Sequence, residues 1–165
     1  MLSTLGVSAC QNLQSHLNPP PIGLYRCRLT YNENQIDVSY HPYSKRTVKS
    51  LKIIHDDAIT YTQKSTDRTH IDKLFNLREE CDDVLIVKNG FVTDTSIANI
   101  AFLKDGVWYT PSTPLLEGTT RERLLDDGFL TAQDIRVEDL ESFSQVALLN
   151  AMIDFDIIAD ITYKI

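Results

Sequence analysis

A chain of 165 residues with 42% hydrophobic and 24% charged side chains has the composition of one globular domain, or of one domain with a small appendage. This composition excludes collagen-like and low-complexity chains, and no apolar run approaches the roughly 20 residues that a membrane-spanning helix needs. The net charge of −7, from 16 basic and 23 acidic side chains, argues against nucleic acid or an anionic membrane as the main partner.

The start of the chain and the cysteines bear on its compartment. Residues 1–21 lack the basic start and continuous apolar core of a secretory signal, so we expect a cytoplasmic protein. Cys10, Cys27 and Cys81 are odd in number and widely spaced, which predicts reduced thiols rather than disulfides or a zinc site. The four histidines do not cluster with carboxylates or cysteines, so no metal site is assigned.

The first half of the chain predicts short strands between two helices. Residues 3–17 weakly predict a helix, which the prolines at 19–21 stop. Residues 23–43 alternate around an Asn-Glu-Asn turn and predict a hairpin. Residues 46–62 are rich in β-branched side chains and predict a pair of short strands or one bent strand. The spacing then changes and predicts a helix over 69–81.

The second half repeats a hairpin pattern. Residues 83–96 turn at Asn89-Gly90, and residues 98–111 turn at Asp105-Gly106, which are strong hairpin signals. A helix is predicted over 119–127 with Gly128 at its end, a short helix over 137–143, and final strands over 145–152 and 156–165. Hairpins joined by a few helices predict an α+β fold with a mostly antiparallel sheet. The glycine-rich motifs of the commonest nucleotide folds are absent.

The helix start at Gly118-Thr119-Thr120 has two interpretations. The first is a cap, in which the Thr119 side chain accepts from backbone N–H groups of the first turn and Gly128 ends the helix. The second is an anion site, because free amides and the positive end of the helix dipole suit a phosphate. Taken alone, the motif favours the cap.

Three further residues bear on the choice between a helix cap and an anion site. Lys64 stands in "YTQKSTDR", before the helix predicted from Thr69, where a lysine is usually a solvated surface charge. Asp94 ends the Asn-Gly hairpin, where one carboxylate is often a turn residue. Asn150 interrupts the buried strand "LLNAM".

The order of these features resembles the class IV aminotransferase family. This family comprises the fold type IV pyridoxal-phosphate enzymes, among them branched-chain and D-amino-acid aminotransferases and 4-amino-4-deoxychorismate lyase. The resemblance runs from about residue 23 to 152, and four segments carry it: "KSTDR" at 64–68, "GFVTDTSIANIAF" at 90–102, "YTPSTPLLEGTTR" at 109–121 and "LNAM" at 149–152.

The resemblance implies a D-amino-acid aminotransferase-like α+β fold. It predicts an abbreviated N-terminal α/β sandwich domain over residues 1–43 and a larger C-terminal cofactor-binding domain over 44–165, a pseudo-barrel of antiparallel strands with helices. A homodimer is also implied, because the family's active site lies between its two domains and near a dimer interface.

The resemblance also implies roles for single residues. Lys64 would form the internal aldimine with pyridoxal 5′-phosphate and shuttle the substrate proton. Asp94, where the family usually has Glu, would pair with the pyridine nitrogen. Asn99 matches a family Asn, for which holding the hairpin is at least as well supported as ligand contact. The remaining residues implied to bind the cofactor, mainly its phosphate, are Gly118, Thr119, Thr120, Asn150, Ala151 and Arg68.

The sequence gives less information about the substrate than about the cofactor. Arg26 and Arg28 alternate on one strand face, where one would meet a substrate carboxylate or both would be solvated. Thr110, in the stiff loop "TPSTP", would line the entrance. The expected substrates are small molecules: an amino acid and a 2-oxo acid for transamination, or aminodeoxychorismate for the lyase.

Residues 1–22 hold no match to the arginine segment that binds the phosphate at the start of family members. Three explanations stay open: Arg68 takes the phosphate, the true start lies upstream, or catalysis has been lost. The functional hypotheses are therefore an aminotransferase acting through Lys64, the lyase that eliminates pyruvate, and a degenerate, non-catalytic binding module. A fourth is an ordinary α+β domain with accidental matches.

Overall fold

The protein divides into two units, one up to Arg46 and one from Thr47 to Ile165. The structure, a computed structural model, describes residues 12–32 and 34–165. The boundary expected between residues 43 and 44 falls just before this division.

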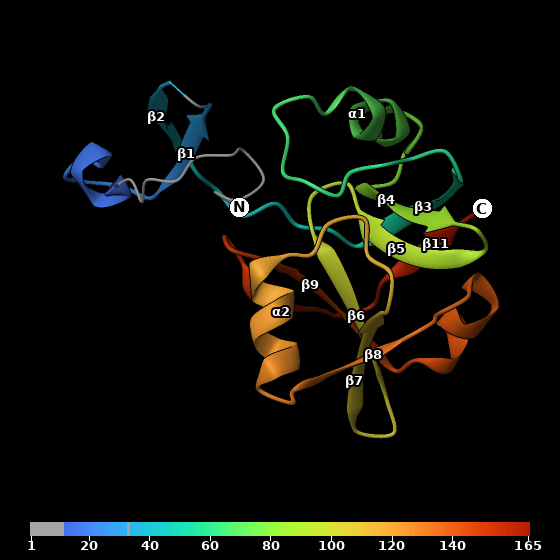
Figure 1. Ribbon diagram of the computed structural model, residues 1–165. Helices are drawn as coiled ribbons and strands as arrows, with labels where there is room; N and C mark the ends of the chain where they lie inside the picture. Colours follow the sequence, from blue (N-terminus) through green and yellow to red (C-terminus); the bar gives the residue numbers. More distant parts are fainter. Residues whose placement is uncertain (1–11, 33) are drawn as a thin grey trace. The chain divides into compact units, whose positions relative to one another are not determined.

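The described part of the N-terminal unit is a β-hairpin preceded by one helical turn (Figure 1). Strands β1 (Tyr25–Tyr31) and β2 (Ile36–Pro42) pair antiparallel, which confirms the predicted hairpin. The helix predicted over 3–17 lies largely outside the described residues. Where it is described, the chain forms the 3-10 turn η2 (Leu13–His16). Of the α/β sandwich expected for this domain, the described residues contain this hairpin and turn.

The larger unit is built on one nine-stranded sheet with the path β10-β9-β6-β5-β4-β3-β11, from which β7 and β8 branch at β6. Most neighbouring strands are antiparallel, as predicted. The strands are β3 (Ser50–His55), β4 (Asp83–Lys88), β5 (Phe91–Thr95), β6 (Asn99–Lys104), β7 (Val107–Pro111), β8 (Leu130–Gln133), β9 (Gln145–Asn150), β10 (Asp154–Ile158) and β11 (Thr162–Lys164).

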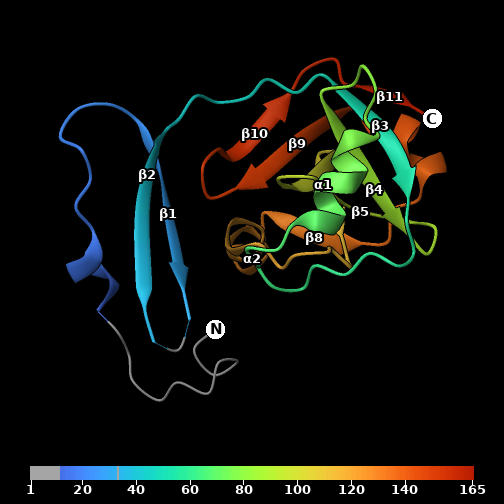
Figure 2. The same cartoon turned by 90° about the horizontal axis from the view of Figure 1, so that it is seen from above.

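Two βαβ crossovers, which the sequence pattern does not predict, interrupt the antiparallel order. Strands β3 and β4 are parallel and are connected through α1 (Thr69–Asn76). Strands β7 and β8 are parallel and are connected through α2 (Thr119–Asp126). Parallel neighbours need such a crossover because a tight turn joins only antiparallel strands. Figures 1 and 2 show α1 and α2 as two separate helices outside the strands of the sheet.

The tight turns agree with the sequence predictions. Strands β4 and β5 are joined at Asn89-Gly90, and β6 and β7 at Asp105-Gly106, with positive φ at all four residues. Two consecutive residues with positive φ are what a two-residue hairpin of type I′ requires. The short helix predicted over 137–143 is the 3-10 turn η3 (Val137–Ser142).

Two element predictions need correction, and one choice between alternatives is decided. Residues 46–62, predicted as a pair of short strands or one bent strand, contain one strand, β3, followed by a loop. Helix α1 ends at Asn76 instead of residue 81, and Glu79 beyond it has a φ of 54°, which is incompatible with a continuing helix. Strand β9 ends at Asn150, two residues before the predicted end.

Strand β4 lies at the centre of the core and is covered on both faces. Leu85 and Val87 join one apolar cluster, while Val84 and Ile86 join another that includes Ile71 of α1. A strand covered on both faces reads as a continuous apolar run, as "VLIV" does. Helix α2 packs through Leu124 on a third cluster, formed with side chains of β6, β7, β8 and β9.

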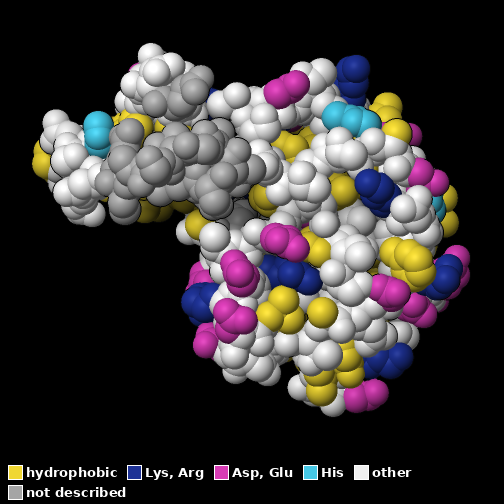
Figure 3. All heavy atoms as spheres, in the orientation of Figure 1, with side chains coloured by type: hydrophobic (Ala, Val, Ile, Leu, Met, Phe, Trp, Pro, Cys, Tyr) yellow, Lys and Arg dark blue, Asp and Glu magenta, His cyan; other side chains and the backbone are white. Residues whose placement is uncertain are grey.

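The surface of the larger unit carries mixed charge. On the face shown in Figure 3, Lys and Arg side chains lie between Asp and Glu side chains. Within residues 12–32 and 34–165, every helix is too short or too polar to cross a membrane.

Candidate cofactor site

One pocket of the larger unit collects residues from four separate segments. They are the loop that leads to α1, the turn between β5 and β6, the segment that starts α2, and the end of β9. The segment that starts α2 follows the carboxyl end of β7, and β9 also ends at this edge of the sheet, beside the turn between β5 and β6. Strand β3 ends at the opposite edge, so the loop before α1 has to return to reach the pocket.

All eight residues that the resemblance implies to bind a cofactor line this pocket. They are Lys64, Arg68, Asp94, Gly118, Thr119, Thr120, Asn150 and Ala151.

Lys64 lies in the loop between β3 and α1, and its side chain is exposed. Within the described part of the chain, its amine makes no hydrogen bond or ion pair. An exposed, unpaired amine at a pocket wall is available to a ligand.

Asp94 is the buried acid of the pocket, with 5% of its surface exposed. Its Oδ1 accepts a hydrogen bond from Nδ2 of Asn99 at 2.7 Å, and its Oδ2 accepts one from the backbone N–H of Leu116 at 3.0 Å. Burial raises the pKa of Asp94 to about 6, although these hydrogen bonds and the charge of Arg121 act in the opposite direction. A buried carboxylate with a raised pKa favours a cationic partner, which would return it to the ionised form.

The start of α2 differs from the predicted cap. Gly118 is the N-cap residue, Thr119 is the first helical residue, and no side chain caps the helix. The prediction that the Thr119 side chain accepts from the first turn is therefore wrong. Gly128 follows the helix with a φ of 70°, as expected of a terminating glycine. Because the first-turn amides lack a side-chain acceptor where Gly118 to Thr120 line the pocket, the helix start suits an anion.

Arg68 joins two walls of the pocket. Its Nη2 donates to the carbonyl oxygen of Ser96 at 2.8 Å, and its Nη1 lies 3.4 Å from the hydroxyl of Tyr61. Its Nε lies 3.6 Å from a carboxylate oxygen of Asp72, one turn further along α1. A guanidinium has five N–H donors, so these contacts leave capacity for an anion.

Asn150 and Ala151 complete the pocket at the end of β9. The Oδ1 of Asn150 accepts from the backbone N–H groups of Met152 and Ile153, at 2.8 and 3.1 Å. Its Nδ2 donates to the carbonyl oxygen of Ile97 at 3.3 Å. The Asn150 side chain thus stabilises the turn that carries Ala151, instead of being free for a ligand.

Of the three residues proposed for substrate contact, only Thr110 belongs to the unit that holds the pocket, and it does not line it. Thr110 is fully buried on β7, and its hydroxyl donates to the carbonyl oxygen of Ile100 at 2.9 Å. The placement of Thr110 at an entrance is therefore wrong, because the sheet consumes its one polar group. Arg26 and Arg28 are exposed on β1, in the N-terminal unit.

Sequence reasoning gave no role to several residues around the site. Tyr61 and Ser96 line the pocket beside Arg68. Both stand in stretches quoted above, "YTQKSTDR" and "GFVTDTSIANIAF", but no role was assigned to either. Arg121 ends the "GTTR" segment, but nothing in the sequence indicates that it is buried, with 7% of its surface exposed. Its Nη2 donates to the carbonyl oxygen of Pro111 at 2.7 Å, and burial lowers its pKa.

Comparison with known proteins identifies the class. The chain shares its fold with a solved fold IV transaminase from Curtobacterium pusillum and with a solved protein named as a "putative" lyase. The family model for class IV amino-transferases matches residues 24–161, and the chain belongs to this family.

Three individual proteins illustrate the relationship. An "Uncharacterized protein" of Haemophilus influenzae is 41% identical over 129 residues, which cover 78% of this chain and 69% of the relative. A "Putative aminodeoxychorismate lyase" of Schizosaccharomyces pombe is 38% identical over 78 residues, 44% of this chain and 34% of the relative. A crystal structure from Haemophilus somnus, named as a "putative 4-amino-4-deoxychorismate lyase", is 40% identical with a TM-score of 0.74. That match covers 79% of this chain and 67% of the solved one.

A more distant structure shows the fold alone. It is the pyridoxal-phosphate-bound form of a hypothetical aminotransferase from Mycobacterium tuberculosis, 18% identical with a TM-score of 0.69. The match covers 84% of this chain and 60% of that one. The chain thus spans between about one third and two thirds of the length of these relatives.

Proposed function

We propose that this protein binds pyridoxal 5′-phosphate in the described pocket and is an enzyme that acts on an amino-bearing substrate through Lys64. One observation carries the proposal: Lys64, Asp94 and the uncapped start of α2 line the same pocket, although they lie far apart in the sequence. An amine, a buried carboxylate and a positive helix end match the aldehyde, ring nitrogen and phosphate of the cofactor. The donor set therefore fits the group.

Each residue has a proposed task. When bound, pyridoxal phosphate supplies an electron-withdrawing ring that stabilises negative charge on the substrate carbon bearing the amino group. Lys64 would hold the aldehyde carbon and move the proton at that substrate carbon. Asp94 would accept from the protonated ring nitrogen. The phosphate is assigned to the amides and hydroxyls at Gly118, Thr119 and Thr120, with Arg68, Asn150 and Ala151 around it.

For the reaction, we propose elimination of pyruvate from 4-amino-4-deoxychorismate. Support comes from two relatives of 38% and 40% identity that carry the lyase name. Transamination between an amino acid and a 2-oxo acid is the second candidate, supported by the description of the family. Both reactions would begin with one lysine removing the proton from the substrate carbon that bears the amino group, so the residues of the pocket serve either.

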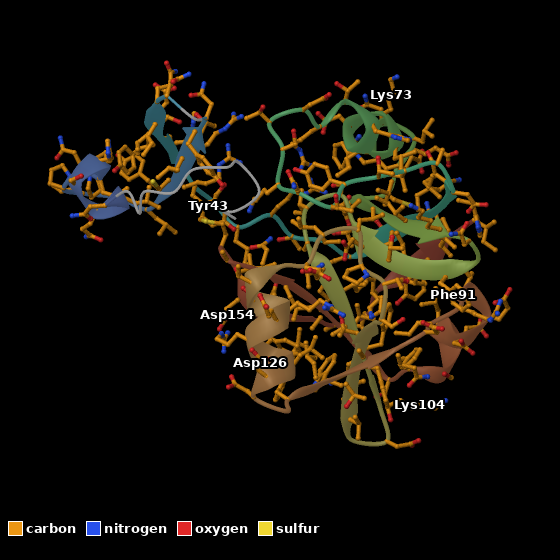
Figure 4. The ribbon with its side chains drawn as sticks, in the orientation of Figure 1. Tyr43, Lys73, Phe91, Lys104, Asp126 and Asp154 are labelled. Carbon is orange, nitrogen blue, oxygen red and sulfur yellow. The ribbon has the colours of Figure 1, made fainter. Side chains whose placement is uncertain are left out.

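The first experiment asks for the cofactor. Purified protein titrated with pyridoxal phosphate should develop a visible absorption band, and borohydride should then fix a pyridoxyl group on Lys64, detected by peptide mass spectrometry. Lys64→Ala should lose both signals. Lys73→Ala removes an exposed lysine of α1 (Figure 4) and should keep both. A colourless protein that takes up no cofactor overturns the proposal and favours a non-catalytic binding module.

The second experiment separates the two reactions. Loaded protein is given aminodeoxychorismate, with pyruvate release measured, or an amino acid and a 2-oxo acid, with amino transfer measured. Pyruvate release that disappears in Lys64→Ala supports the lyase. Amino transfer without pyruvate release favours the aminotransferase instead.

A cytoplasmic homodimer remains part of the proposal. Ile97, in the β5–β6 turn, and Met152, in the turn after β9, expose 43% and 38% of their surfaces beside the pocket. Two exposed apolar side chains do not form a patch by themselves, so the dimer is proposed from the resemblance to the family. Sedimentation equilibrium on the purified chain tests the dimer.

A further inference from the structure

Asn99 at the start of β6 pairs with Asp94 of β5, and only 6% of its surface is exposed. Its Nδ2 donates to Oδ1 of Asp94 at 2.7 Å and to the carbonyl oxygen of Leu116 at 2.8 Å. Both acceptors require a donor, so the hydrogen bonds define which end of the amide is nitrogen. The Oδ1 of Asn99 is thereby directed to a third group.

That third group is Gly118. A Cβ built on Gly118 would lie 2.0 Å from Oδ1 of Asn99, far inside any contact distance. The backbone of Gly118, with φ −73° and ψ 137°, is one that any residue adopts. Glycine is therefore required at position 118 by the space that Asn99 occupies and not by backbone conformation.

The loop before α2 is thus attached to Asp94 by two routes. The backbone N–H of Leu116 donates directly to Oδ2 of Asp94 at 3.0 Å. Asn99 bridges from Oδ1 of Asp94 to the carbonyl oxygen of Leu116 and lies against Gly118, the N-cap of α2. One buried amide therefore connects the carboxylate to the start of the helix.

We propose that Asn99 is a positioning residue that fixes the distance between Asp94 and the start of α2. The inference rests on the proposed function, in which Asp94 holds the ring nitrogen and the helix start holds the phosphate. The cofactor is a planar ring with a short phosphate arm. Its ring nitrogen and its phosphate can contact Asp94 and the helix start together only if the separation of these two groups is fixed. Losing Asn99 should therefore weaken the hold of Asp94 on the ring and should, in addition, weaken the hold of the helix start on the phosphate, although Asn99 does not need to touch the cofactor.

The first test is a double-mutant cycle on the cofactor-free protein, followed by thermal unfolding. Gly118→Ala forces a Cβ into Oδ1 of Asn99 and should lower Tm by about 4 °C or more. In the Asn99→Ala background that obstacle is gone, so Gly118→Ala should lower Tm by only about 2 °C or less, the cost of exchanging an N-cap glycine for alanine. If Asn99→Ala does not fold, Asn99→Ser retains a small donor and replaces it in the cycle. If the Tm change of the double variant equals the sum of the changes of the two single variants, the proposal is overturned.

The second test compares pyridoxal phosphate with pyridoxal, which lacks the phosphate, by absorbance titration. In Asn99→Ala, binding of pyridoxal phosphate should weaken about 10-fold or more. Binding of pyridoxal should weaken less, so the preference for the phosphate falls. Asn76→Ala, at the exposed end of α1, is the matched control and should leave both affinities unchanged.

The two tests distinguish the inference from the proposed function. If the wild-type protein binds neither compound, the proposed function fails, while the unfolding cycle still decides whether Asn99 fixes the start of α2. If the cofactor binds and its phosphate preference is unchanged in Asn99→Ala, Asn99 is structural only. That result overturns the inference and leaves the function standing.

Discussion

The Nη2 atom of Arg68 donates to the carbonyl oxygen of Ser96 at 2.8 Å, and both residues line the candidate cofactor pocket. This bond connects the segment before α1 to the turn between β5 and β6. The guanidinium thereby holds a positive charge at the pocket wall, with N–H donors left over.

Replacing Arg68 with Gln should weaken the binding of pyridoxal phosphate about 10-fold, because a phosphate loses a charged donor. Pyridoxal, which carries no phosphate, should lose less. Absorbance titration with both compounds measures the difference. Equal losses for the two compounds would limit Arg68 to a role in the pocket wall.

Thr119→Pro is a specific test of the helix start as an anion site. Thr119 is the first residue of α2, where proline is tolerated, and Gly118 has the extended conformation preferred before proline. The substitution should leave thermal stability within about 2 °C while removing one amide N–H from the pocket. We expect weaker pyridoxal-phosphate binding in the titration. Thr119→Ala keeps the amide and separates its contribution from that of the hydroxyl, and equal affinities in the two variants would contradict the amide's role.

Arg121→Met should destabilise the protein by about 2 kcal/mol, because the buried carbonyl of Pro111 loses its donor. Urea unfolding measures the change. Arg123 is the matched control on the same helix. Although it lies 2.6 Å from Asp154, both side chains are more than half exposed, so Arg123→Met should cost less than about 1 kcal/mol. Equal effects of the two substitutions would show that the Arg121 hydrogen bond adds nothing to stability.

The pH dependence of stability should report on Asp94. Its pKa of about 6 lies above its ordinary value of 3.8, so between these values the folded protein holds a proton that the unfolded chain releases. The stability from this group is fully present below pH 3.8 and is lost as the pH rises through 6. For the cofactor-free protein, the loss between pH 5 and 7 is roughly 1 to 1.5 kcal/mol.

The matched pair for this effect is Asp94→Asn and Asp126→Asn, compared with the wild-type protein by urea unfolding at both pH values. Asp94→Asn should remove that part of the pH dependence. Asp126 is exposed at the opposite end of α2 from the pocket (Figure 4), so Asp126→Asn should retain it. An unchanged pH dependence in Asp94→Asn would rule out the raised pKa.

The local elements could be predicted because their signals are short-range. Asn89-Gly90 and Asp105-Gly106 carry backbone conformations that few other dipeptides adopt, so both hairpins follow from two residues each. Helix α1 shows the limit. Ile71, Leu74 and Cys81 are all buried, as the helical spacing predicts, yet the helix ends before Cys81. Burial of a position does not by itself define the backbone that brings it inside.

The site was predictable as a set of residues but not as an arrangement. Its eight expected cofactor contacts line one pocket. Thr110 does not line the pocket, because it is buried on β7 and its hydroxyl donates to the carbonyl oxygen of Ile100 on the neighbouring strand. Tyr61, Ser96 and Arg121 lie in the quoted segments, but their contacts could not be predicted, since those depend on partners elsewhere in the chain.

The amino-acid sequence by itself determined the hairpins and the presence of α2 with a glycine after it, because each depends on neighbours along the chain. The tertiary structure decided the two parallel crossovers and, through them, which loops meet at the pocket. It also decided that Gly118 must be glycine. That requirement arises from Asn99, nineteen residues earlier, whose side chain occupies the space where a Cβ would stand.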